Sequence, residues 1–142
     1  YLPRTCIKVK YITGLLLLAF AVPSWAETVM YCSTELATGF VQKNGSWREI
    51  NFVGKRYTIK FNDDLTRLDG LLDSSSFNCV VPYGEANYDA VYCTSEFNNG
   101  NSFLLNTKTN RFVYVETSPF GYVGASKDSD TDTIVAGTCT KF

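Results

Sequence analysis

The chain contains no histidine, and this absence narrows the chemistry that its side chains could perform. Histidine is the usual general base near neutral pH and the commonest metal ligand in proteins. Its absence excludes Ser-His-Asp and Cys-His nucleophilic arrangements. The catalytic possibility that remains is hydrolysis by two carboxyl groups, one of which acts as an acid and the other as a base or nucleophile.

Closely spaced acidic residues supply the candidates for such a carboxyl pair. Each candidate lies in or next to a predicted turn, where an aspartate side chain commonly accepts a hydrogen bond from its own segment of backbone. We therefore interpret these side chains as turn residues, and a small carboxylate-dependent hydrolase is the third of three functional hypotheses. The pairs are Asp63 with Asp64, Asp69 with Asp73, and Asp89 with Glu96.

Three alternating aspartates, Asp128, Asp130 and Asp132, are the candidate for a metal site. Their spacing fits the first half of an EF-hand loop, in which carboxylates alternate along the chain. That loop also needs a glycine at its sixth position and a glutamate at its twelfth, where this chain has Thr133 and Cys139. The pattern therefore predicts loose calcium binding at most, and no cofactor is predicted.

Aromatic residues in predicted loops are the first choice for a contact surface. Tyr83, Phe120 and Tyr122 each stand beside a glycine between predicted strands, where burial is harder to achieve. Aromatic residues within the strands are expected to fill the core instead, because each one can bury about 150–250 Å².

Four of the five cysteines, Cys32, Cys79, Cys93 and Cys139, follow the N-terminal segment and are expected to form two disulfides. An even number of cysteines in an exported chain without histidine indicates disulfides rather than a metal site. Three pairings are possible. We favour Cys79–Cys93, which closes a candidate hairpin, together with Cys32–Cys139, which joins the first predicted strand to the last.

The first 26 residues have the composition of a secretory signal peptide. Lys8 and Lys10 precede the apolar run 12–22. Ser24 and Ala26 then place small residues at the −3 and −1 positions of a signal-peptidase site. The eleven residues of the apolar run span about 16 Å as a helix, whereas a bilayer core needs roughly 30 Å. We therefore expect cleavage after Ala26 and no membrane anchor.

Residues 1–6 precede Ile7, where a leader of ordinary length would begin, so we expect them to be upstream translation or the sign of a fragment. Removal of residues 1–26 leaves ten basic and fourteen acidic residues, a net charge of −4. Nucleic acid and anionic membranes require clustered lysine and arginine. Nucleic acid is therefore not an expected partner, and the cleaved domain is not expected to insert into a membrane.

Most of the remaining sequence alternates between apolar and polar residues in short segments, which is typical of half-buried strands. Asn44-Gly45 is a strong hairpin signal, because both residue types tolerate positive φ. The alternative to a strand is a helix at 33–38, which begins with a possible capping sequence. The predicted strands are 28–32, 37–42, 46–52, 56–61, 66–71, 77–81, 88–94, 102–106, 111–117 and 133–140, with a short strand at 122–123.

This pattern predicts an all-β fold, in which one antiparallel sheet of about eight to ten short strands closes as a small barrel or sandwich with two disulfides. The connections are too short for the crossovers that parallel strands need. About 116 residues suffice for one core but not for two. We therefore expect 1–26 to be the signal peptide and 27–142 to be a single secreted β domain.

Four segments resemble those of small exported proteins of unassigned function from marine bacteria and their phages. The segments are YCSTELATG (31–39), NGSW (44–47), YTIKF (57–61) and AGTC (136–139). The resemblance runs through most of the expected mature domain. It implies a bacterial setting and the Tyr-Cys start and Gly-Thr-Cys end of the domain, and it brings no activity or catalytic residue.

The leading functional hypothesis is an exported, non-enzymatic binding domain, periplasmic or secreted, whose partner is a protein or a small ligand. A disulfide-braced β scaffold presents its loops rigidly, and binding residues commonly lie on such loops. The second hypothesis is a structural, envelope-associated protein with no small ligand. The sequence does not indicate the oligomeric state.

Overall fold

The structure of the protein is a computed structural model that describes residues 27–72, 75–82, 89–97, 99–117, 121–124, 127–128 and 130–142. Within these ranges the chain forms strands and turns, and no helix there could cross a membrane. The predicted signal peptide and its cleavage site at Ala26 lie outside the described residues. The strands are β1 (Thr28–Lys43), β2 (Ser46–Asn51), β3 (Arg56–Phe61), β4 (Arg67–Leu72), β5 (Ser75–Val80), β6 (Ala90–Ser95), β7 (Ser102–Asn106), β8 (Arg111–Glu116) and β9 (Thr131–Lys141).

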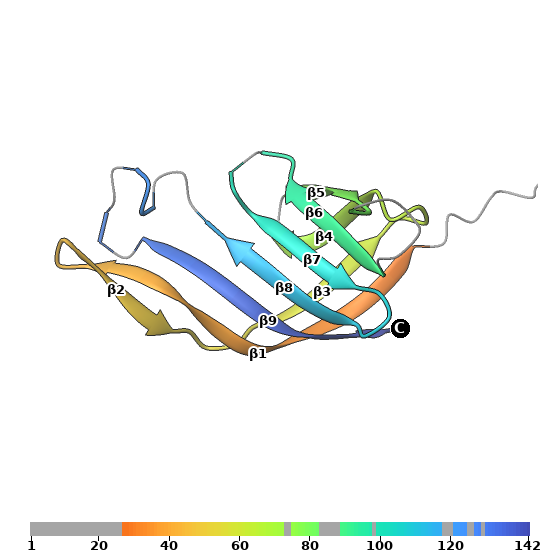
Figure 1. The fold of residues 1–142 in the computed structure, drawn as a ribbon, viewed down its shortest axis with the longest axis horizontal. Helices are drawn as coiled ribbons and strands as arrows, with labels where there is room; N and C mark the ends of the chain where they lie inside the picture. Colours follow the sequence, from red (N-terminus) through yellow and green to blue (C-terminus); the bar gives the residue numbers. More distant parts are fainter. Residues whose placement is uncertain are drawn as a thin grey trace, which may run out of the picture.

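Eight of the strands close into an antiparallel barrel (Figure 1). Their order is β1-β3-β4-β5-β6-β7-β8-β9, and pairing between β9 and β1 completes the ring. β2 is an additional strand that pairs with the second half of β1. The predicted all-β fold with one closed antiparallel sheet is confirmed, and of the two expected forms the barrel is the one observed.

Side chains from alternating strand positions fill the barrel. In β8, for example, Phe112 and Tyr114 are buried while Val113 is partly exposed. Such alternation follows from the two-residue period of a strand. The rings of Phe103 and Phe112 stack with centroids 5.4 Å apart, and Tyr57 meets Phe112 edge-on at 6.2 Å. Aromatic packing therefore supplies much of the core, as the composition predicts.

β1 is one long strand where the sequence predicts two, and the alternative helix at 33–38 is wrong. The strand pairs with β9 from Met30 to Val41, so that ladder supplies the hydrogen bonds that a helix would otherwise supply locally. An irregularity between Thr34 and Leu36 adds one residue to β1 relative to β9, as in a β-bulge. The turn after β1 confirms the hairpin signal, with φ of 52° at Asn44 and 74° at Gly45.

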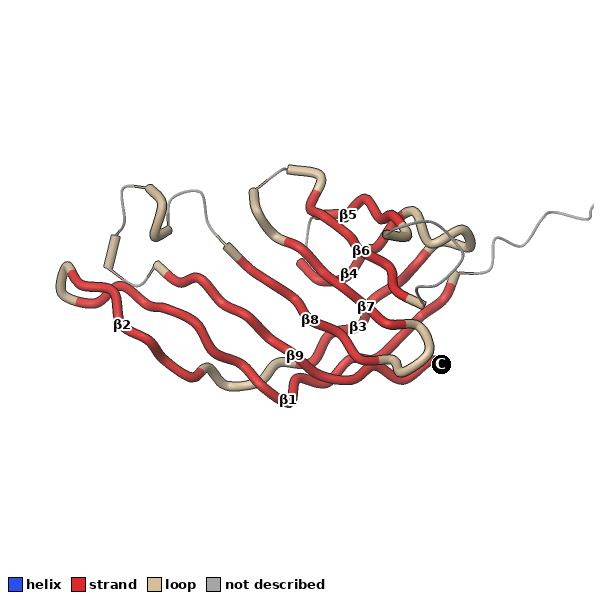
Figure 2. The backbone as a smooth tube through the Cα atoms, in the orientation of Figure 1, coloured by secondary structure: helices blue, strands red, loops and turns tan. Residues whose placement is uncertain are grey.

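Part of the sheet projects beyond the barrel (Figure 2). We call this part the sheet extension and define it as residues 38–43 of β1, the whole of β2, and residues 131–134 of β9. β2 pairs with β1 alone among the described strands, so its outer side is a free edge of the sheet.

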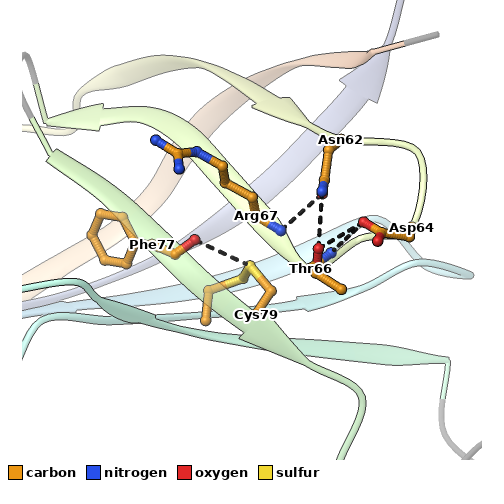
Figure 3. The surroundings of a disulfide bond; sticks show 7 residues. Asn62, Asp64, Thr66, Arg67, Phe77 and Cys79 are labelled. Atoms are coloured by element: carbon orange, nitrogen blue, oxygen red, sulfur yellow. Dashed lines mark hydrogen bonds between the residues drawn. A yellow bond between two sulfur atoms is a disulfide. The ribbon is translucent and has the colours of Figure 1, made fainter. Parts of the chain in front are cut away.

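Both predicted disulfides are confirmed, and each joins residues that lie directly opposite each other on neighbouring strands. Cys32 of β1 bonds Cys139 of β9, and Cys79 of β5 bonds Cys93 of β6. All four residues are buried in the core. Figure 3 shows Cys79 beside Phe77 in β5, next to the turn that leads into β4. Two disulfides in a small β domain are typical of proteins from oxidising compartments.

A glycine allows β9 to approach β1 closely beside the first disulfide. A Cβ atom at Gly137 would collide with the backbone oxygen of Ser33 and would lie 3.0 Å from the ring of Phe112. The ring of strands therefore closes at a position that only glycine can occupy without displacing its neighbours.

Candidate functional site

The predicted contact residues divide between described and undescribed segments. Tyr83 and Phe120 lie outside the described residues. Tyr122 is described, is about two-thirds exposed, and lies in a turn closed by a 3.1 Å hydrogen bond from the amide of Gly124 to the carbonyl of Gly121. The short strand predicted at 122–123 is therefore wrong, because a turn occupies that place. The ring of Tyr122 meets Trp47 of β2 edge-on, with centroids 5.6 Å apart.

The three aspartates of the predicted calcium loop accept hydrogen bonds from three different backbone amides. Asp128 accepts from Gly45 at 3.3 Å, Asp130 from Lys127 at 2.7 Å, and Asp132 from Tyr122 at 3.2 Å. No cluster of three metal-ligating side chains occurs in the part of the chain that the structure describes. Two of these bonds connect Asp128 with the turn between β1 and β2, and Tyr122 with Asp132 of β9.

Three carboxyl groups of the candidate pairs contact residues outside their predicted pairs. Asp64 accepts hydrogen bonds from the hydroxyl and amide of Thr66, and these bonds lower the pKa of Asp64 below its ordinary value. Asp69 and Glu96 come from different predicted pairs but both contact Arg67, each at 3.4 Å (Figure 3 shows Arg67 and the adjoining turn). Asp73 lies outside the described residues. The carboxyl groups of Asp69 and Glu96 therefore lie in ion pairs with the same arginine.

Apolar side chains also cover much of the outer face of the barrel. One row of directly opposite residues crosses six strands from β5 to β1, and the last member, Leu36, is 72% exposed. Large contiguous apolar patches on a soluble protein commonly mark binding surfaces. The row consists of Val80, Tyr92, Leu104, Val113, Ala136 and Leu36.

Beside this row an apolar groove of about 420 Å³ lies on the outer face of the sheet extension. Phe40 of β1, Val115 of β8 and Ile134 of β9 form its floor, and Tyr122 and Val123 border it. Phe40 and Ile134 are about half exposed. The groove therefore combines strand residues from three chain segments with the one described member of the predicted contact set.

Sequence reasoning found Tyr122 but missed the strand residues of the groove. The available signal is that the segments 111–117 and 133–140 carry apolar residues on both faces, for example Tyr114 and Val115. A strand that faces solvent on one side usually alternates with polar residues. Apolar residues on both faces of a strand thus indicate that its outer face also contacts other groups.

Tyr114, a buried residue of β8, provides a test of the packing inside the barrel. Burial raises the pKa of Tyr114 above its ordinary value, and the charge of Glu116 raises it further. The folded state therefore keeps this proton when the unfolded state begins to lose it, near pH 10. The stabilising effect is complete below about pH 10 and is lost as the pH rises beyond it.

We expect the free energy of unfolding to fall above about pH 10 and to fall less steeply in Tyr114→Phe than in the wild type. Urea denaturation at a series of pH values between 8 and 11.5, about the range of tyrosine ionisation, measures the slope. Tyr92→Phe on the outer face of β6 is the control. If Tyr92→Phe flattened the slope as much as Tyr114→Phe, the assignment to Tyr114 would be wrong.

No protein-family model matches this chain, and no curated protein matches its sequence significantly. The candidate site is therefore defined by the geometry of the chain itself.

Proposed function

We propose that this protein is an exported, non-enzymatic interaction domain that binds an extended segment of a partner protein along the sheet extension. The observation that carries the proposal is the apolar groove floored by Phe40, Val115 and Ile134. Buried apolar contact is the main favourable term in most protein association. The buried disulfides support the exported setting, because cytosolic thiols are usually kept reduced.

β2, which pairs with the groove strand β1, offers such a segment a free sheet edge. The amide of Phe52 donates to the carbonyl of Ala37 at 2.9 Å, so even-numbered residues of β2 bond to β1. The backbone groups of Trp47, Glu49 and Asn51 consequently point away from β1. A partner segment can add there as a further strand, with main-chain bonds for affinity and side chains for specificity.

A second copy of this chain is a poor partner for that edge. Two antiparallel copies of β2 must match their outward-facing residues, and the longest such overlaps place Arg48 opposite Arg48 or Glu49 opposite Glu49. Like charges directly opposite each other destabilise strand pairing. The edge therefore favours a different strand, with an acidic residue opposite Arg48 or a basic residue opposite Glu49.

Photocrosslinking in cells of the source organism tests the groove. With p-benzoylphenylalanine at position 40, illumination should give a discrete adduct with a partner protein. The crosslinked segment of that partner, made as a synthetic peptide, should bind the purified protein in calorimetry. Ile134→Asp should weaken this binding at least about ten-fold, because an unpaired carboxylate would be buried against apolar side chains.

Two controls accompany the experiment. Position 97, an exposed phenylalanine in the turn after β6, should give no such adduct when it carries the same crosslinker. Val80→Asp, at an exposed apolar residue on the outer face of β5, should leave the peptide affinity within about two-fold of the wild type. An adduct formed only with a second copy of the chain, or equal effects of Ile134→Asp and Val80→Asp, would refute the proposal.

A further inference from the structure

The barrel wall opens between β3 and β4, and a cavity of about 370 Å³ lies at this opening. The two strands pair at two positions only, Lys60 with Asp69 and Phe61 with Leu68. Farther along, Gly70 has a φ of +95°, and a side chain there would collide with the backbone oxygen of Thr58. β3 and β4 thus lie close together at Gly70 although their residue pairing does not extend that far. Small-molecule sites have volumes of roughly 300–1,000 Å³, so the cavity is large enough for a ligand.

A buried tyrosine hydroxyl without a partner lines this cavity. Tyr114 is only 1% exposed, and its hydroxyl oxygen has no hydrogen-bond partner among the described residues. Its ring is held by edge contacts with Tyr57 at 5.9 Å and Phe77 at 6.3 Å between centroids. Buried polar groups in native proteins nearly always have a partner. The unpartnered hydroxyl therefore indicates a position at which a bound ligand would supply the missing hydrogen-bond partner.

A carboxylate lines the same cavity. Glu116 lies two residues after Tyr114 on β8, so both side chains project from the same face of the strand. After burial, the charge of Glu116 is the next cause that raises the pKa of both Tyr57 and Tyr114, which places it near both hydroxyls. Glu116 takes part in none of the ion pairs in the described part of the chain. An acceptor and a neutral hydroxyl thus face one cavity together.

We infer that this cavity binds a small, neutral polyhydroxy compound, such as a single sugar unit, whose hydroxyl groups bond to Tyr114 and Glu116. Lys55 and Arg56 also line the cavity, so a ligand with one charge would meet a like charge on one side. A hydroxyl group can donate to a carboxylate and accept from a tyrosine, lysine or arginine. The site is separate from the partner groove and does not depend on it.

Saturation-transfer NMR and titration calorimetry with the purified protein test the site. The probes are glucose, galactose, mannose and N-acetylglucosamine, with ethylammonium and acetate as singly charged probes. We expect saturable binding of at least one sugar and of neither charged probe. Tyr114→Phe and Glu116→Gln should each weaken sugar binding at least about ten-fold, because each removes a bond to the ligand without changing the shape of the cavity.

The stability of the variants separates binding from folding. Tyr114→Phe should raise the Tm by roughly 5 °C, because it removes an unpaired buried hydroxyl. Tyr92→Phe on the outer face of β6 should leave binding unchanged. The inference is overturned if no sugar binds saturably, if only a charged probe binds, or if Tyr114→Phe binds sugar as the wild type does. Ile134→Asp should keep full sugar binding, so failure of this inference and failure of the proposed function are distinguishable.

Discussion

Removal of the Cys32–Cys139 disulfide is expected to lower the free energy of unfolding by about 5 kcal/mol. The two cysteines are 107 residues apart in sequence, and a crosslink over a long loop restricts the unfolded chain most strongly. The bond also joins β1 to β9, the pair of strands that completes the barrel. Urea denaturation of Cys32→Ala/Cys139→Ala without reductant measures the loss.

The second disulfide provides a matched control for this prediction. Cys79 and Cys93 are likewise buried and directly opposite each other, but they are only 14 residues apart in sequence. Cys79→Ala/Cys93→Ala should therefore cost about 3 kcal/mol. The two variants remove the same atoms from the core, so the difference between them reports on loop length. A larger loss for the short loop would contradict this account of the Cys32–Cys139 bond.

Phe112→Ala is expected to lower the free energy of unfolding by about 3–5 kcal/mol. The ring is 2% exposed, stacks on Phe103, and meets Tyr57 edge-on. Its removal would leave a cavity at the centre of the aromatic packing, where the surrounding rings cannot collapse to fill it. Urea denaturation followed by circular dichroism measures the change.

An exposed phenylalanine, Phe97, provides the control for Phe112→Ala. Phe97 lies in the turn after β6 and is 68% exposed, so Phe97→Ala should change the free energy of unfolding by no more than about 0.5 kcal/mol. The same chemical change is thus made inside and outside the core. Similar losses for the two variants would show that Phe112 does not occupy the barrel interior.

Much of the fold was predictable because its determinants are local. Alternating apolar residues in 56–61 indicate a strand with one buried face, and Asn44-Gly45 indicates a tight hairpin. The pairing of Cys32 with Cys139 was predictable because a closed sheet must join its ends. The course of β1 was not, because Ser33 and Thr34 are typical of a helix cap, and only the distant β9 provides the pairing that keeps them extended.

The candidate site was predictable only in part, because it depends on contacts between segments far apart in the sequence. Tyr122 could be identified from its position between glycines. Phe40 and Ile134 could not, because their outward direction depends on the register between β1 and β9. In the same way, no local feature distinguishes Tyr114, whose hydroxyl is buried without a partner, from the exposed Tyr92.

The extra residue in β1 determines which side chains lie on the outer face of the sheet extension. Ahead of the irregularity the even-numbered Cys32 is buried in the barrel, and after it the odd-numbered Ala37 packs against the core. If β1 kept the same sequence but paired without this irregularity, a single parity would run through the strand and Phe40 would turn inward. The irregularity therefore determines whether the sheet extension presents Phe40 or Gly39 on its outer face.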